Sequence, residues 1–134
     1  MRTSLSTWLL AFAVTVFAAS AGMAATTLPA QTSSQSGVTV KVTPRNLTSG
    51  TWEFDVVFDT HSQALTDDLQ KTAVLLSDGR ASQSPLKWQG DPPGSHHRKG
   101  VLQFKPVSPM PAMIELQFKR GGETAARSFL WQLK

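Results

Sequence analysis

From position 38 onward, apolar and polar residues alternate along most of the chain. Such alternation with a period of two places apolar side chains on one face of a β-strand and polar side chains on the other. The clearest example is the run 51–59, in which the apolar positions are Trp52, Phe54, Val56 and Phe58. The pattern predicts antiparallel sheets that are buried on one face only.

Turn residues divide the alternating region into short segments. The predicted strands are residues 38–43, 51–59, 72–76, 84–88, 99–104, 113–119 and 126–133. One helical turn is expected at 65–69, capped by Thr66. Seven short strands in about a hundred residues predict an all-β fold, a single antiparallel immunoglobulin-like β-sandwich, with a small barrel as the alternative.

The first residues have a different pattern. Arg2 precedes an apolar run at 8–19, and small residues follow it. This layout is typical of a secretory signal peptide, which we assign to residues 1–24, with cleavage after Ala21 or Ala24. An uncleaved anchor is the alternative, although the run is shorter than the ~20 residues that span a bilayer. We therefore expect an exported mature chain, periplasmic or secreted, with no membrane span.

The segment that follows is small and polar, TTLPAQTSSQSG, with no hydrophobic period. Such composition is typical of flexible chains. We expect a flexible linker over residues 25–37 and the folded domain over residues 38–134.

Composition excludes several classes of site. The chain has no cysteine, so it has no disulfide, thiolate nucleophile or thiolate metal ligand. The formal net charge of +4 falls to +3 when Arg2, the one charged residue of the signal segment, is removed. Lysines and arginines are interspersed with acids and form no stripe, so we expect no nucleic-acid partner.

The stretch WQGDPPGSHHRKGVLQF, residues 88–104, carries the densest candidate chemistry. Pro93-Gly94 suits a type II turn. If strands 51–59 and 99–104 pair antiparallel, the end of the first lies beside the start of the second. His61 would then meet His96 and His97 at one corner of the sandwich.

Two interpretations of this corner stay open. The first is a site for Cu(II) or Zn(II), ions that imidazole and carboxylate ligands suit. Its candidate ligands are His61, His96 and His97, with Asp59 or Asp91. The second is a structural network in which Arg98 pairs with one of these carboxylates and the histidines hydrogen-bond the loop backbone.

Two motifs carry a resemblance. Residues 52–54, WEF, lead to DTHS at 59–62, and residues 88–102 read W-x-G-D-P-P-G-x-H-H-R-x-G-V-L. Together they resemble a loosely defined group of uncharacterised prokaryotic exported domains, and the resemblance covers most of residues 38–133. It implies a small β-sandwich and an exported location, and it carries no activity to transfer.

The expected function is that of a binding or interaction module. The chain contains no G-x-S-x-G, H-E-x-x-H or phosphate-loop motif, so we do not expect an enzyme. We expect an unknown protein or cell-envelope partner and no cofactor; the alternative is a periplasmic protein that binds copper or zinc at the histidine corner. A binding module predicts an exposed apolar patch or an open sheet edge, for example along 84–88.

Overall fold

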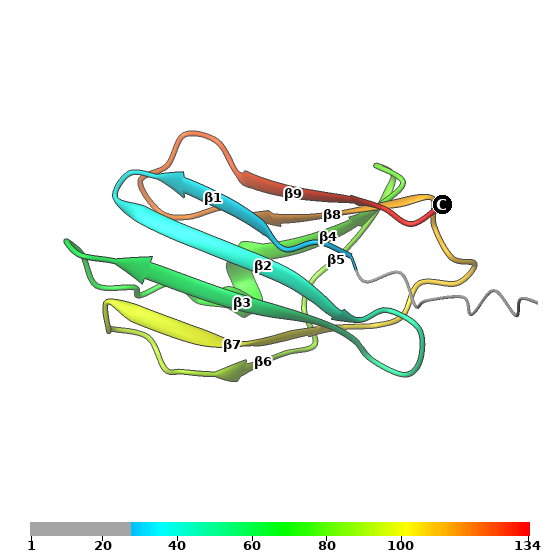
Figure 1. Ribbon diagram of the computed structural model, residues 1–134, viewed down its shortest axis with the longest axis horizontal. Helices are drawn as coiled ribbons and strands as arrows, with labels where there is room; N and C mark the ends of the chain where they lie inside the picture. The colour runs from blue at the N-terminus through cyan, green and yellow to red at the C-terminus, as the bar shows by residue number, and fades with distance from the viewer. Residues whose placement is uncertain (1–27) are drawn as a thin grey trace, which may run out of the picture.

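The computed structural model describes residues 28–134, which form two antiparallel sheets packed face to face (Figure 1). The predicted signal peptide lies outside the described residues. The elements in chain order are β1 (Gln31–Gln35), β2 (Val38–Asn46), β3 (Trp52–Thr60), α1 (Leu69–Thr72), β4 (Ala73–Ser77), β5 (Ala81–Gln83), β6 (Lys87–Gly90), β7 (His97–Phe104), β8 (Met113–Phe118) and β9 (Arg127–Gln132). None of the helical segments within residues 28–134 has the length and apolarity needed to cross a bilayer.

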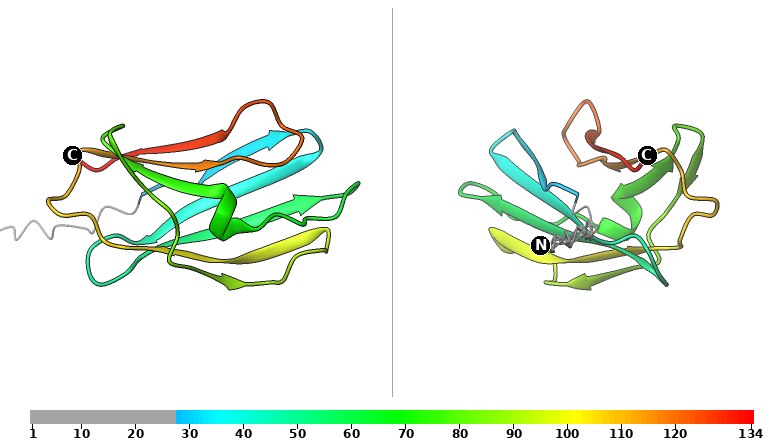
Figure 2. Two further views of the ribbon diagram at one scale, coloured as in Figure 1. Left: turned by 180° about the vertical axis from the view of Figure 1, so that it is seen from behind. Right: turned by 45° about the vertical axis from the view of Figure 1, so that its right-hand side comes forward.

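The strand order confirms the predicted immunoglobulin-like sandwich. One sheet has the order β1-β2-β3-β7-β6 and the other β5-β4-β8-β9. Strands β2-β3-β7-β6 take the places of A-B-E-D in that fold, and β5-β4-β8-β9 take those of C′-C-F-G. Figure 2 shows the two layers from two further directions.

The alternating residues form the core, as the sequence predicts. Trp52, Phe54, Val56 and Phe58 of β3 are all buried between the sheets. Aromatic rings from the two layers meet edge to face: the centroids of Phe58 and Phe118 are 5.7 Å apart. Such pairs add about 0.5–1.5 kcal/mol to the stabilisation from burial.

The prediction of a flexible linker over residues 25–37 is wrong for the part that forms β1. Residues Gln31–Gln35 pair antiparallel with β2 along their full length. Ser36 and Gly37 connect the two strands with φ of 52° and 74°. Positive φ at both positions is the geometry of a type I′ turn, which matches the twist of a hairpin.

A buried guanidinium fixes this hairpin to the opposite sheet. Arg127, at the start of β9, donates hydrogen bonds to the carbonyl oxygens of Ser33 (3.1 Å), Gln35 (2.9 Å) and Val38 (2.9 Å). Its remaining donors bind the Glu123 carboxylate at 2.9 and 2.8 Å. The polar N-terminal strand is thus held by hydrogen bonds, which a search for apolar alternation does not detect.

The carboxylate of this cluster makes stability depend on pH. The hydrogen bond from Arg127 lowers the pKa of Glu123, and burial opposes the shift. A carboxyl whose pKa is lower in the folded state stabilises above its unfolded pKa, about 4.3, and the stabilisation is lost as pH falls through the folded value. We expect Glu123→Gln to flatten the acid-side decrease of the melting temperature, measured by thermal unfolding between pH 7 and pH 3. Parallel curves for the two proteins would contradict this.

Two glutamine side chains bridge the sheets on opposite flanks. The Gln31 amide binds both the backbone N–H (3.0 Å) and the carbonyl of Leu130 in β9. The Gln83 amide binds the carbonyl (2.9 Å) and N–H (3.2 Å) of Lys105. A primary amide offers the same donor and acceptor as a peptide group. At Leu130, Gln31 therefore occupies the position that an added strand would need.

Two further predictions need correction. The helical turn begins after Asp68, whose side chain caps Gln70 N at 3.2 Å, rather than after Thr66. The strand predicted at 84–88 is confirmed only for residues 87–88, the start of β6, because residues 84–86 connect β5 in one sheet to β6 in the other. Pro85, which has no N–H to give to a ladder, lies in the segment that crosses between them.

Candidate functional site

The histidine corner forms where β3 ends and β7 begins. Asp59 lies directly opposite His97 in the antiparallel register, and Thr60 N–H donates to the His96 carbonyl at 2.9 Å. His61 follows Thr60 in the chain. The meeting of the two segments is therefore confirmed for the backbone, at the end of the sandwich opposite the C-terminus (Figure 1).

The side chains of the corner are exposed. His97 Nδ1 is hydrogen-bonded to Asp59 Oδ1, with 58 % and 53 % of these side chains accessible. His61 and His96 are also exposed. Within residues 28–134, no group of three or more His, Asp or Glu side chains is placed to hold a metal ion. Binding of copper or zinc by the three histidines stays a prediction.

Arg98 lies between the sheets rather than at the surface. It was expected to pair with a carboxylate of Asp59 or Asp91, but it donates to the carbonyl oxygens of Asp91 (3.0 Å) and Asp67 (2.6 Å). The reason is strand parity: Arg98 points inward, on the face opposite to Asp59. Burial lowers the pKa of Arg98, against the attraction of nearby aspartates. Its guanidinium lies 5.4 Å from the centre of the Trp88 ring, within the range of a cation–π contact.

Asp91 has a structural role at the end of β6. Its carbonyl accepts from Trp88 Nε1 (3.0 Å) as well as from Arg98. The backbone N–H of Lys99 donates to the Asp91 carboxylate at 2.9 Å, and not to a backbone carbonyl of the neighbouring strand. The acid of the W-x-G-D motif thus replaces a backbone partner in the ladder.

The two glycines of the motif accommodate the tryptophan ring. Gly90 and Gly100 are paired across β6 and β7. A Cβ on Gly100 would lie 2.6 Å from Gly90 Cα and 2.7 Å from Trp88 Cζ2. Only glycine allows the two strands and the ring to approach this closely. Packing and hydrogen bonding therefore account for Trp88, Gly90, Asp91, Arg98 and Gly100 of the motif.

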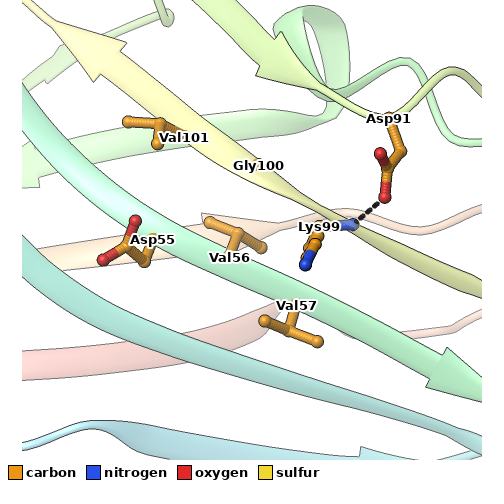
Figure 3. Close-up of a pocket in the computed structure, with 7 residues that line it drawn as sticks. All are labelled: Asp55, Val56, Val57, Asp91, Lys99, Gly100 and Val101. Atoms are coloured by element: carbon orange, nitrogen blue, oxygen red, sulfur yellow. Dashed lines mark hydrogen bonds between the residues drawn. The ribbon is translucent and has the colours of Figure 1, made fainter.

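A shallow depression of about 390 Å³ lies on the outer face of the five-stranded sheet (Figure 3). Its lining residues are Asp55, Val56, Val57, Asp91, Lys99, Gly100 and Val101. Both of its carboxylates have partners within the protein: Asp91 binds Lys99 N–H, and Asp55 lies 3.7 Å from Arg45. The depression has the character of a solvated sheet face whose carboxylates already have partners.

The outer face of the four-stranded sheet has different chemistry. Leu76, Glu115 and Leu130 are direct neighbours across β4, β8 and β9. Val74 and Met113 point outward in the rows on either side. Leu130 is 42 % exposed. We call these five residues the aliphatic patch.

Glu115 at the centre of the patch is held in place by its neighbours. Its Oε1 accepts hydrogen bonds from Gln117 Nε2 (2.9 Å) and Ser128 Oγ. These bonds lower the pKa of Glu115, against a smaller effect of burial. No hydrogen bond from the described part of the chain reaches Oε2. The patch therefore presents an ionised carboxylate with one free oxygen between two leucines.

This patch is not among the features predicted from the sequence. Its signal was present in the alternation itself, since Leu76 and Leu130 occupy outward positions where polar residues are usual.

No family model, curated protein or solved structure matches the chain. Function is therefore inferred from the surface chemistry described above.

Proposed function

We propose that the mature chain is a non-catalytic binding module of the periplasm or extracellular medium, which engages a protein partner through the aliphatic patch of its four-stranded sheet. The exported location is supported by the signal-peptide pattern of residues 1–24. The observation that carries the binding role is the row Leu76–Glu115–Leu130, in which a carboxylate lies between two leucines on the outer face of the sheet.

Other exposed apolar residues support a binding surface less well. Leu86 (48 % exposed) lies in the crossover before β6, and Met110 (39 % exposed) lies in the loop before β8. Neither belongs to a sheet face. Leu130 lies on a sheet face in one row with Glu115 and Leu76, and burying such a side chain fully is worth roughly 1.5–3 kcal/mol. A cluster of this kind on a monomer's surface marks an interaction site.

The outer face of the five-stranded sheet can be compared with the aliphatic patch. On the outer face of the five-stranded sheet, Arg45 lies 3.8 Å from Glu53 and 3.7 Å from Asp55. Arg45 is near both carboxylates, so a basic partner that binds either one competes with an existing ion pair. The four-stranded sheet requires no such exchange.

Photo-crosslinking tests the proposal. A benzophenone amino acid placed at Leu130 in the full-length protein, produced in its own cells, is expected to give an adduct of defined mass on irradiation. The same group at Thr43, on the outer face of the five-stranded sheet, is the control and is expected to give none. Adducts at position 43 only, or at neither position, would contradict binding through the patch.

A further inference from the structure

We propose that the partner inserts a lysine or arginine side chain, flanked by aliphatic residues, between Leu76 and Leu130, where it binds Glu115 Oε2. This inference rests on the proposed binding role of the aliphatic patch. It names the chemistry of the partner, which the two leucines alone do not determine.

The row geometry suits a long basic side chain. Residues directly opposite on neighbouring strands have Cβ atoms about 4.5–5.5 Å apart, so Leu76 and Leu130 flank the Glu115 carboxylate closely. Lysine and arginine carry a methylene stem below the charged group, and the stem packs against apolar surface. A basic side chain would therefore contact the leucines with its stem and the carboxylate with its head.

The Glu115 carboxylate is already oriented for such a contact. Gln117 and Ser128 both donate to Oε1, which fixes the orientation of the group and leaves Oε2 open. A hydrogen bond between two charged groups is roughly twice as strong as one between neutral groups. Once the leucines are covered, water is excluded from the pair and its attraction increases.

The chemistry of the face argues against a second copy of the chain as its occupant. The outward-facing residues of β4, β8 and β9 are Val74, Leu76, Met113, Glu115, Gln117, Ser128, Leu130 and Gln132. These residues include one acid and no base. A two-fold dimer buries the same patch on both subunits, which would bring two Glu115 carboxylates together with no cation between them.

The edge strand beside the patch, β9, already has a hydrogen-bonding partner at Leu130. Gln31 binds the N–H and carbonyl of Leu130, where an added strand would pair. The partner is therefore expected to dock its side chains on the face rather than extend the sheet.

The test is selection of random twelve-residue peptides, displayed on phage, against the purified exported protein. We expect the selected peptides to carry a lysine or arginine between aliphatic residues. We expect their affinity to fall at least tenfold on Glu115→Gln, a variant that keeps the Oε1 acceptor for Gln117 and Ser128. Glu53→Gln on the opposite sheet is the control and is expected to leave the affinity unchanged.

A second variant, Leu130→Ser, separates this inference from the proposed function. Leu130 is exposed, so the variant is expected to fold, which circular dichroism verifies. Peptides that need Leu130 but lack a basic residue, or bind Glu115→Gln as well as wild type, would overturn the basic partner and leave binding by the patch intact. No enrichment, or peptides indifferent to Leu130→Ser, would overturn both. A dimer in sedimentation analysis that Leu130→Ser abolishes would make the occupant a second copy and overturn the inference.

Discussion

Arg127→Ala is expected to lower the free energy of unfolding by about 3–5 kcal/mol, the range for removing one partner of a buried ion pair. The guanidinium is almost fully buried and makes five hydrogen bonds. Its removal leaves the Glu123 carboxylate with Arg120 as its remaining guanidinium partner, at 3.2 Å. It also removes a donor from the carbonyl oxygens of Ser33, Gln35 and Val38, so the loss combines a weakened buried ion-pair cluster with backbone acceptors that lose a partner. Urea unfolding of wild type and variant measures this difference in the free energy of unfolding.

Arg45→Ala is the matched control for this prediction. Arg45 is 56 % exposed, and its contacts with Glu53 and Asp55 are 3.8 and 3.7 Å. Exposed pairs of this kind contribute about 0–1 kcal/mol. Amide hydrogen exchange of β1 adds a local readout and is expected to accelerate in Arg127→Ala only. If Arg127→Ala unfolds like Arg45→Ala, with β1 still protected, the N-terminal strand is held by something other than the buried cluster.

The strands with an apolar face were predictable because their hydrophobic period coincides with burial. The alternation in β3 identifies its inward residues directly, and the order of turns and strands leads to the immunoglobulin-like topology. β1 was not predictable in this way, because its side chains are polar and its attachment comes from backbone pairing and from donors on β9. Its available signal was Ser36-Gly37 immediately before an alternating run, which is a hairpin turn sequence.

For the buried arginines, the alternation of the strand predicts burial better than the usual exposure of arginine does. Arg127 shares the parity of Phe129 and Trp131, and Arg98 shares the parity of Leu102. Period-two reasoning therefore places both guanidinium groups between the sheets. The usual exposure of arginine led instead to an expected surface ion pair for Arg98. Parity was the stronger guide, because backbone carbonyls inside the sandwich supply the acceptors.

At the histidine corner, strand order predicts which backbone segments meet but not where their side chains point. Antiparallel pairing of β3 with β7 was enough to bring His96 to Thr60, since backbone register follows from strand order. The directions of the side chains do not follow from register, because each depends on local rotamers and partners. The candidate site on the opposite sheet was missed for a related reason: Glu115 is an ordinary outward residue until its two donors and two leucine neighbours are known.

Gly100→Ala is expected to destabilise the protein by about 1–3 kcal/mol or more, as overpacking of a close contact does. The added Cβ would lie 2.6 Å from Gly90 Cα, 2.7 Å from the Gln89 carbonyl oxygen and 2.7 Å from Trp88 Cζ2. Two of these atoms belong to the backbone of β6, so a change of side-chain rotamer cannot relieve the overlap. β6 must move away from β7, which also withdraws Trp88 from Arg98. Chemical denaturation measures the loss, and tryptophan fluorescence is expected to shift toward longer wavelength as Trp88 becomes exposed.

Gly121→Ala is the control for this substitution, since a Cβ at Gly121 meets nothing within 4 Å. Its unfolding free energy is expected to stay within about 0.5 kcal/mol of wild type, as for other surface changes. A further variant, Gly100→Ala combined with Trp88→Ala, removes the overlap with the ring and keeps the two overlaps with backbone. It is expected to remain at least as unstable as Gly100→Ala. Recovery of stability in the double variant would instead locate the strain in the ring alone. Equal stability of Gly100→Ala and Gly121→Ala would mean that β6 moves outward freely and that the glycine pair is not what packs Trp88 against Arg98.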